Sequence, residues 1–232
     1  MTQKTPTEPT SSSPTPASTL LLARRITPAQ AARRAKAIAA ARMLAQQGGY
    51  VAVNMTDVAA RSGFGRATLY RYFASKDHLL AEVTSQWGTE LITELKTRPP
   101  RGRTTSERVA SVFERVIEVA REHPRLTEAA VAAALSADPS ATTAWQAGAA
   151  LVEGYLESAL GDEPLLEREQ VGRALGYVFL SALILMTSGR VSGEEAVAQL
   201  ASAARLMLEP RSAPPPPRPA GRRRSLPTGG SR

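Results

Sequence analysis

Helix-breaking residues punctuate the middle of this chain, and strong helix formers fill the stretches between them. Alternating β-branched residues reach no further than Val51-Ala52-Val53, which is too short for a half-buried strand. The breaks lie at Gly48-Gly49, Gly63, Pro99-Pro100, Pro124, Pro139, Gly161 to Pro164 and Gly189. The sequence therefore predicts an all-α fold with short connections, its helices covering residues 28–47, 54–62, 66–73, 76–97, 105–122, 125–136, 140–160, 166–188 and 192–208.

Composition limits the chemistry that the chain can perform. It has 232 residues, of which 43% are hydrophobic, enough for one large domain or two small ones. It contains no cysteine, which excludes disulfides, thiol nucleophiles and cysteine-ligated metals. Only two histidines are present, His78 and His123, and neither lies near a nucleophile in sequence. We therefore expect no catalytic residue, no metal site and no cofactor, and we expect that the chain is not an enzyme.

Charge is distributed unevenly along the chain. Residues 28–80 hold eight Lys or Arg against two Asp or Glu, a net charge of +6, whereas residues 98–210 hold eleven against fifteen, a net charge of −4. Basic segments of this kind meet polyanions, most often nucleic acid. Residues 1–23 and 210–232 are rich in Ser, Thr, Pro or Arg and have little to bury, so they are predicted to be disordered tails. The basic run in the second tail is either a solvated charge cluster or a weak phosphate contact.

The most apolar segment lies between Arg173 and Arg190. A membrane-spanning helix needs roughly 20 predominantly apolar residues. This segment is shorter and contains Gly176 and Ser181, so a buried helix is expected. Because no secretory signal precedes Ala23 either, we expect a soluble, cytoplasmic protein without membrane contact.

Residues 54–73 have the spacing of a helix-turn-helix. Asn54 is a good N-cap for the first helix, and Gly63 falls in the turn, where a positive φ is needed. Leu69 and Phe73 share the buried stripe of the second helix. The side chains left to face outward are mostly hydroxyls and guanidiniums, on a helix that the major groove of DNA can admit: Arg66, Ala67, Thr68, Tyr70, Arg71 and Tyr72.

These residues also carry a family resemblance. The stretch from Ala67 to Leu80, ATLYRYFASKDHLL, resembles the pattern T-L-Y-x-Y-F-x-S-K-x-x-L of the TetR family of bacterial transcriptional regulators. Gly49-Tyr50 and Asp57-Val58-Ala59 also fit, and the resemblance covers residues 30–95. Farther along, Pro124 to Ala129 and Ala137 to Ala141 are similar to the steroid-catabolism repressor branch of the family. The resemblance implies a three-helix DNA-binding head over residues 24–75 and a larger helical effector-binding and dimerisation body over residues 76–209.

The resemblance also implies roles for individual residues. Base-reading positions in the first turn of the recognition helix match Arg66, Ala67 and Thr68. The other DNA-binding candidates match phosphate-contacting positions or lie on the same outward face: Asn54, Thr56, Tyr70, Arg71, Tyr72 and Lys76. Gly65 departs from the family pattern, which often has a polar N-cap there. Glycine at an N-cap costs only a few tenths of a kcal/mol.

Some of these residues allow a second interpretation. Arg66 either pairs with a guanine edge or contacts a phosphate. Lys76 falls in the first turn of its predicted helix, where the dipole disfavours a cation and attracts phosphate, or it extends into solvent. Tyr70 and Tyr72 could be core aromatics, but the buried stripe is already occupied and their hydroxyls need partners.

The implied body holds a pocket for a hydrophobic small molecule, which the branch resemblance narrows to a steroid or a fatty-acyl thioester. Its long side chains are expected to be mostly core: Phe113, Trp145, Tyr155, Tyr177, Phe179 and Met186. The last two long helices match the pair that forms a homodimer. There Gly172 and Gly176 either admit a partner helix or allow close packing within one subunit. Helix 76–97 is expected to be a rigid lever and the sole link through which a ligand moves the head.

These observations predict a ligand-responsive, sequence-specific regulator that binds double-stranded operator DNA as a homodimer. Repression that is released by the small molecule is the preferred mode of action. Two alternatives belong to other classes of protein. One is a helical enzyme that uses the cavity of the body, and the other is a basic membrane-surface or scaffold protein.

Overall fold

The computed structural model describes residues 27–161 and 168–209, except for the side chains of residues 143–145, 147–152 and 155. The predicted tails 1–23 and 210–232 lie outside the described residues, as does the start of the predicted helix 166–188. The described residues form helices and no strand, which confirms the all-α prediction. The helices are α1 (Pro28–Ala52), α2 (Met55–Ser62), α3 (Arg66–Tyr72), α4 (Lys76–Lys96), α5 (Thr105–Glu122), α6 (Pro124–Ala134), α7 (Pro139–Leu160), α8 (Arg168–Thr187) and α9 (Gly193–Leu208).

Side-chain caps account for where several helices begin. The side chains of Thr27, Thr104 and Ser192 each accept a hydrogen bond from the backbone amide three residues ahead, and the backbone amide of each of these caps donates to the Gln or Glu side chain at that same position. The predicted end of the first helix is present as an interruption: Gly48 and Gly49 leave helical φ/ψ, and one further turn follows to Ala52. This kink directs the chain into α2.

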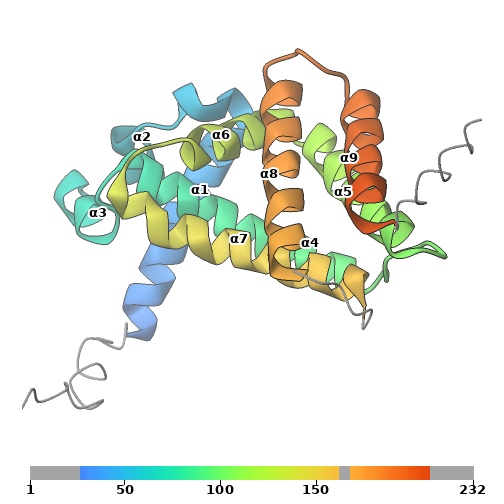
Figure 1. Cartoon of the computed structure of the whole chain (residues 1–232). Helices are drawn as coiled ribbons and strands as arrows, with labels where there is room; N and C mark the ends of the chain where they lie inside the picture. The colour runs from blue at the N-terminus through green and yellow to red at the C-terminus, as the bar shows by residue number, and fades with distance from the viewer. Residues whose placement is uncertain (1–26, 162–167, 210–232) are drawn as a thin grey trace, which may run out of the picture.

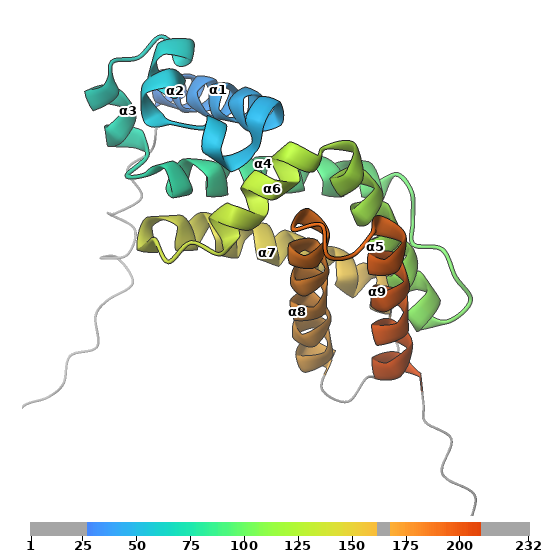
Figure 2. The ribbon, with the colours of Figure 1, turned by 90° about the horizontal axis from the view of Figure 1, so that it is seen from above.

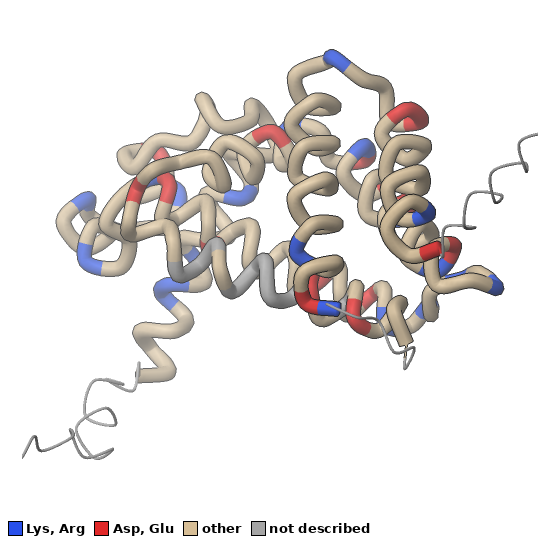
Figure 3. The backbone as a smooth tube through the Cα atoms, viewed as in Figure 1, with Lys and Arg blue, Asp and Glu red and all other residues tan. Residues whose placement is uncertain are grey.

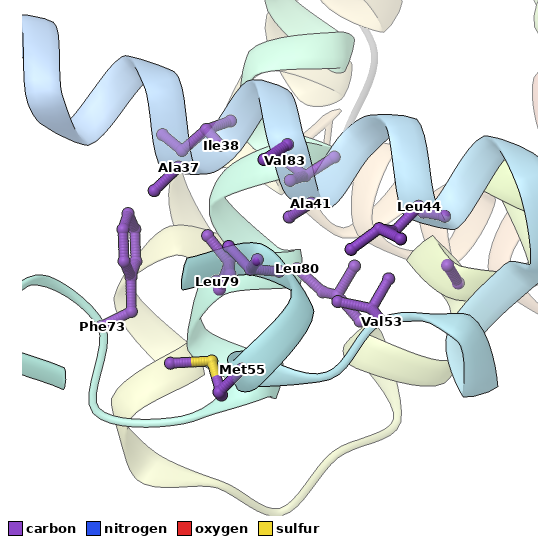
Figure 4. Packing of buried hydrophobic residues seen from close by; sticks show 14 of the residues in the cluster. Ala37, Ile38, Ala41, Leu44, Val53, Met55, Phe73, Leu79, Leu80 and Val83 are labelled. Carbon is purple, nitrogen blue, oxygen red and sulfur yellow. The ribbon is translucent and has the colours of Figure 1, made fainter. Parts of the chain in front are cut away.

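The first core lies in the head, the part of the molecule that contains α1, α2 and α3. Side chains from α1, α2, α3 and the first half of α4 meet there, as the packed residues of Figure 4 show. Leu69 and Phe73, the predicted buried stripe of the second helix of the motif, are both fully buried in it. Ile38, Leu44, Val58 and Leu80 are also buried in this cluster, so α2 and α3 are held on a platform formed by α1 and α4.

The second core lies in the body and involves the other half of α4. Ile92 and Leu95 of α4 pack there with residues of α5, α7, α8 and α9. Figures 1 and 2 show α4 running from the head to the body, with α8 and α9 side by side at the opposite end of the molecule from α3. The predicted long helix between head and body is therefore present, and each half of it belongs to a different core.

The prediction that α4 is the sole link between head and body is wrong. Helix α6 packs against α1, and its residues Leu126, Ala129 and Ala133 are buried in the head cluster. The prediction failed because the apolar face of α6 carries no sign of which helix will cover it. The domain boundary at residue 75 stays a prediction. The core of the head continues across that position, because it includes both Phe73 and Leu79.

Helix α8 corrects the expectation of a buried helix. Of its residues, only Leu175 and Ala182 are buried, and Tyr177 is 67% exposed although it was expected to be core. Among the described helices, α8 is also the one long and apolar enough to cross a membrane by length and composition. Helices α6, α7 and α9 cover α8 on part of its surface only, so the described residues leave apolar side chains of α8 partly exposed.

Candidate nucleic-acid interface

The helix-turn-helix is built by local signals that the structure bears out. The Asn54 side chain accepts a hydrogen bond of 2.9 Å from the Asp57 amide and caps α2. Gly63 has φ 75° and donates its amide hydrogen back to the last turn of α2. A side chain with a Cβ is disfavoured in this left-handed conformation, so glycine suits the tight turn. The chain then enters α3 at the angle that Leu69 needs to reach the core.

The outer face of α3 presents charge and hydroxyls to solvent. Arg66, Ala67 and Arg71 are exposed, and Tyr70 is 44% exposed. Within the described part of the chain, neither arginine is engaged in an ion pair. Figure 3 shows basic positions on α3 at the tip of the head, at a distance from the acidic positions of the body. Gly65 provides no side-chain cap for α3, so the first amides of this helix stay available to an anion.

Two predicted contact residues are less accessible than their neighbours. Thr68 is half-buried, and the Tyr72 ring packs against the head cluster, 6.5 Å from the Phe73 ring between centroids. Tyr72 is therefore partly a core aromatic, one of the two interpretations open from the sequence.

The start of α2 contributes a second edge to this surface. Asn54 and Thr56 are exposed, and the Asn54 amide nitrogen donates to an Asp57 carboxylate oxygen at 2.6 Å. The side chain of Asn54 is thus occupied at both ends by its own helix, whereas Thr56 is open to solvent.

Lys76 is placed differently from the other basic candidates. Its ammonium nitrogen lies 3.6 Å from the centroid of the Tyr50 ring, where a cation and the negative face of the ring attract each other. Burial lowers the pKa of Lys76, and the negative charges of Asp77 and Glu128 partly oppose that shift. Ser75 caps α4 by accepting from the His78 amide at 2.9 Å, so Lys76 lies in the first helical turn as predicted.

Asp77 ties three elements together beside Lys76. One carboxylate oxygen accepts a hydrogen bond from the Tyr50 hydroxyl at 2.7 Å, and the other accepts from the Ser136 hydroxyl at 2.6 Å. These contacts join the last turn of α1 and the turn after α6 to the first turn of α4. The bond from Tyr50 to Asp77, together with burial and the Asp77 charge, raises the pKa of Tyr50 to about 12.

Sequence reasoning missed Tyr50, Asp77 and Ser136 as parts of the site. Tyr50 and Asp77 were noticed only as members of the family pattern. The segment around Ser136 was noticed only as a branch resemblance. A signal for their contact was absent, because 59 positions separate Asp77 from Ser136.

The body contains a small apolar cavity beside α4. Its volume is about 30 Å³, and the described residues that line it are all apolar: Gly88, Leu91, Ile92, Leu95, Val112, Phe113, Val116, Leu156 and Phe179. Phe113 and Phe179 stack at one side with their ring centroids 5.6 Å apart. Sites for drug-sized ligands are roughly 300–1,000 Å³, so these helices must separate before this cavity can hold one.

From the sequence, Gly172 and Gly176 of α8 could either admit a partner helix or allow close packing within one subunit. The space around them in the structure distinguishes between these two roles. A Cβ added at Gly172 or Gly176 would meet no described atom within 4 Å. Close packing within the subunit is therefore not their role among the described residues. They lie on the helix whose apolar face is left uncovered.

Comparison with known proteins yields consistent matches for the head and the body. Residues 37–83 match the family described as bacterial regulatory proteins, tetR family, and residues 102–207 match the tetracyclin repressor-like C-terminal domain. The chain is 32% identical over 181 residues to the HTH-type transcriptional repressor KstR of Rhodococcus jostii strain RHA1, a match covering 78% of this chain and 84% of that protein.

Solved structures resemble the fold over a similar extent. A TetR transcriptional regulator from Rhodococcus sp. RHA1 matches with a TM-score of 0.68 and 26% identity, over 79% of this chain and all (100%) of that one. Thermus thermophilus FadR, a repressor solved in complex with lauroyl-CoA, matches with a TM-score of 0.61 and 22% identity, over 81% of this chain and 100% of its own. At that identity the second match supports the fold alone.

Proposed function

The chain belongs to the TetR family of bacterial regulatory proteins, and from that premise we propose that it is a homodimeric repressor that a hydrophobic small molecule releases from its operator. The observation that carries the proposal is the outer face of α3. Arg66, Tyr70 and Arg71 are exposed there, whereas Leu69 of the same helix is fully buried. A helix held in this way can enter the major groove.

DNA contacts divide by position on the head. Arg66, Ala67 and Thr68 begin α3 and read base edges, because the first turn of a recognition helix points at the bases. The phosphate contacts lie around them and come from Asn54, Thr56, Tyr70, Arg71, Tyr72 and Lys76. Phosphate contacts position the protein without reading sequence. Lys76 makes its contact by leaving the face of Tyr50.

The proposed dimer forms through α8 and α9. One head spans too few base pairs to be specific alone, so two-fold symmetry and an inverted-repeat operator are expected. The exposed Tyr177 and the unfilled space at Gly172 and Gly176 lie on α8, and Leu206 of α9 is 67% exposed. A second copy packed on this face would remove that apolar surface from water.

The proposed effector is a steroid or a fatty-acyl thioester. The described residues that line the cavity beside α4 are all apolar, which suits hydrocarbon. Residues 124–129 and 137–141 resemble the steroid-catabolism repressor branch, and the FadR neighbour is described with lauroyl-CoA. Because the cavity is small, the ligand must favour a conformation in which the helices around Phe113 and Phe179 have separated.

The test is a reciprocal titration. DNA bound by the protein is first selected from random sequence, and the binding of lauroyl-CoA and of a steroid thioester is then measured with and without saturating selected DNA. A hundredfold weakening of operator binding corresponds to about 2.7 kcal/mol of coupling, and linkage requires the same factor in the opposite direction. Equal ligand affinity in both titrations would contradict release by that ligand. Failure to select any DNA would contradict the assignment of the chain as a DNA-binding regulator. Turnover of the ligand would favour an enzyme.

A further inference from the structure

The turn between α6 and α7, residues 135–140, reaches from the body to the start of α4. Ser136 donates its hydroxyl hydrogen to Asp77 at 2.6 Å, and the hydroxyls of Ser140 and Ser75 lie 3.4 Å apart. Ser75 is the N-cap of α4 and Asp77 lies in its first turn. Both head residues lie within five positions of Tyr72, the last residue of α3. The turn thus contacts the segment that leads directly out of the recognition helix.

Hydrogen bonds within the turn hold its residues together. The Asp138 carboxylate caps α7 by accepting from the Ser140 amide at 2.8 Å and from the Ser140 hydroxyl at 2.7 Å. The Asp138 amide donates to the Ser136 hydroxyl oxygen at 3.2 Å. Hydrogen bonds from Ser140 and Ser75 hold the pKa of Asp138 below its usual range, so its carboxylate stays charged and keeps accepting near neutral pH. Asp138 thus connects Ser136 to Ser140 by hydrogen bonds.

The two helices that meet at the turn contact the two parts of the molecule that a ligand signal has to join. These parts are the apolar cavity and the head core. Leu156 of α7 lines the apolar cavity, and Ala141, at the other end of α7, is buried against Ala81 of α4. Helix α6 lies in the head core through Ala129 and others, and a Cβ at Gly49 would overlap the Glu128 carboxylate. The path from cavity to recognition helix is thus continuous without the second half of α4.

We propose that the α6–α7 turn is a coupling element that positions the first turn of α4, through Ser136 with Asp77 and Ser140 with Ser75, and so links the state of the body to the placement of the head. This inference rests on the proposed DNA-binding function. Ser136 and Ser140 are positioning residues, because they act on the DNA-contacting turn through Asp77 and Ser75.

Amide hydrogen exchange tests the coupling with selected operator DNA as the probe. In the wild-type chain, DNA should slow exchange in the head and also across residues 124–141. In the double variant Ser136→Ala, Ser140→Ala, DNA should still slow exchange in the head, while exchange across residues 124–141 stays at the rate of the DNA-free protein. If the serines had a purely structural role, the double variant would have a changed melting temperature, but DNA would still slow exchange both in the head and across residues 124–141.

The controls separate the possible outcomes. Ser188→Ala, at an exposed serine after α8, should behave as wild type, and Ser136→Thr, which keeps a hydroxyl, should restore slowing in the presence of Ser140→Ala. If the double variant loses its helical circular dichroism, Ser136→Ala alone replaces it. Slowing across residues 124–141 that persists without the serine hydroxyls, or is absent from the wild type with DNA bound, overturns the inference. Absence of slowing in the head as well overturns the proposed function.

Discussion

The ammonium of Lys76 lies 3.6 Å from the centroid of the Tyr50 ring, so the lysine predicted to bind phosphate packs on an aromatic face in this structure. A cation over a ring at a partly exposed site gains roughly 0.5–1 kcal/mol. A phosphate near the N-terminus of α4 can compete for this lysine, because the helix dipole adds to the attraction of the ammonium for the anion.

Lys76→Ala should therefore weaken binding to all DNA sequences and flatten the dependence of affinity on salt. Each phosphate that the protein no longer neutralises lowers the log–log slope by about 0.9. Lys96→Ala is the matched control, since Lys96 is an exposed lysine at the other end of the same helix. Binding constants measured over a range of salt concentrations give both slopes. Equal slopes for the two variants would remove Lys76 from the interface.

Arg66→Ala should relax sequence preference at one base pair of each half-site. A bidentate arginine–guanine pair is worth roughly 1–3 kcal/mol of discrimination. Arg71→Ala, in the last turn of the same helix, should lower affinity evenly across sequences. Competition binding with a panel of single-base operator variants measures both effects. An unchanged base preference in Arg66→Ala would assign this residue to phosphate contact instead.

Gly49→Ala should destabilise the fold more than Gly63→Ala. Both glycines have positive φ, 68° and 75°, but a Cβ at Gly63 meets nothing within 4 Å, whereas one at Gly49 would overlap the Glu128 carboxylate. Gly63→Ala should cost roughly 1–2 kcal/mol of unfolding free energy from backbone strain. Urea unfolding compares the two, and Glu128→Ala should recover part of the additional loss in Gly49→Ala. Additive effects of Gly49→Ala and Glu128→Ala would show that the two residues do not meet.

The phenol of Tyr50 should ionise at a higher pH than an ordinary tyrosine phenol does. Its pKa is raised from 10.0 to about 12, mainly by the hydrogen bond to Asp77, so the folded state favours the protonated phenol. The associated stability is fully present below pH 10 and is lost as the pH rises through about 12. Phenolate absorbance against pH should show a late transition that Tyr50→Phe removes and Tyr70→Phe leaves in place. Persistence of that transition in Tyr50→Phe would contradict the assignment.

Tyr177→Glu should convert the proposed dimer to a monomer, because it places a charge where an exposed aromatic side chain of α8 would be covered by the second copy. Met43→Glu is the control, since Met43 of the head is 51% exposed and lies outside α8 and α9. Sedimentation velocity measures the mass of each variant. A dimer that survives Tyr177→Glu would place the interface elsewhere, and sedimentation with added vesicles would detect membrane association of α8.

The helix-turn-helix could be predicted from the sequence because each of its signals acts within a few residues. Asn54 caps the helix that follows it, Gly63 sets one turn, and Leu69 repeats the apolar spacing of its own helix. Caps, turns and helical periodicity depend on neighbours in sequence, so the printed order of residues contains them. The same holds for the breaks that separate the other helices.

Only the tertiary structure decided which helix faces meet. The apolar stripe of α6 is as compatible in sequence with the body as with the head, yet Leu126 is buried in the head core. The hydrophobic effect is not directional, so an apolar face does not specify what covers it. The contact of Asp77 with Tyr50 and Ser136 depends on the path of the whole chain, because a hydrogen bond forms only after packing has brought distant residues within reach. The sequence by itself therefore determined the local elements and the DNA-reading motif, and packing determined how the body holds that motif.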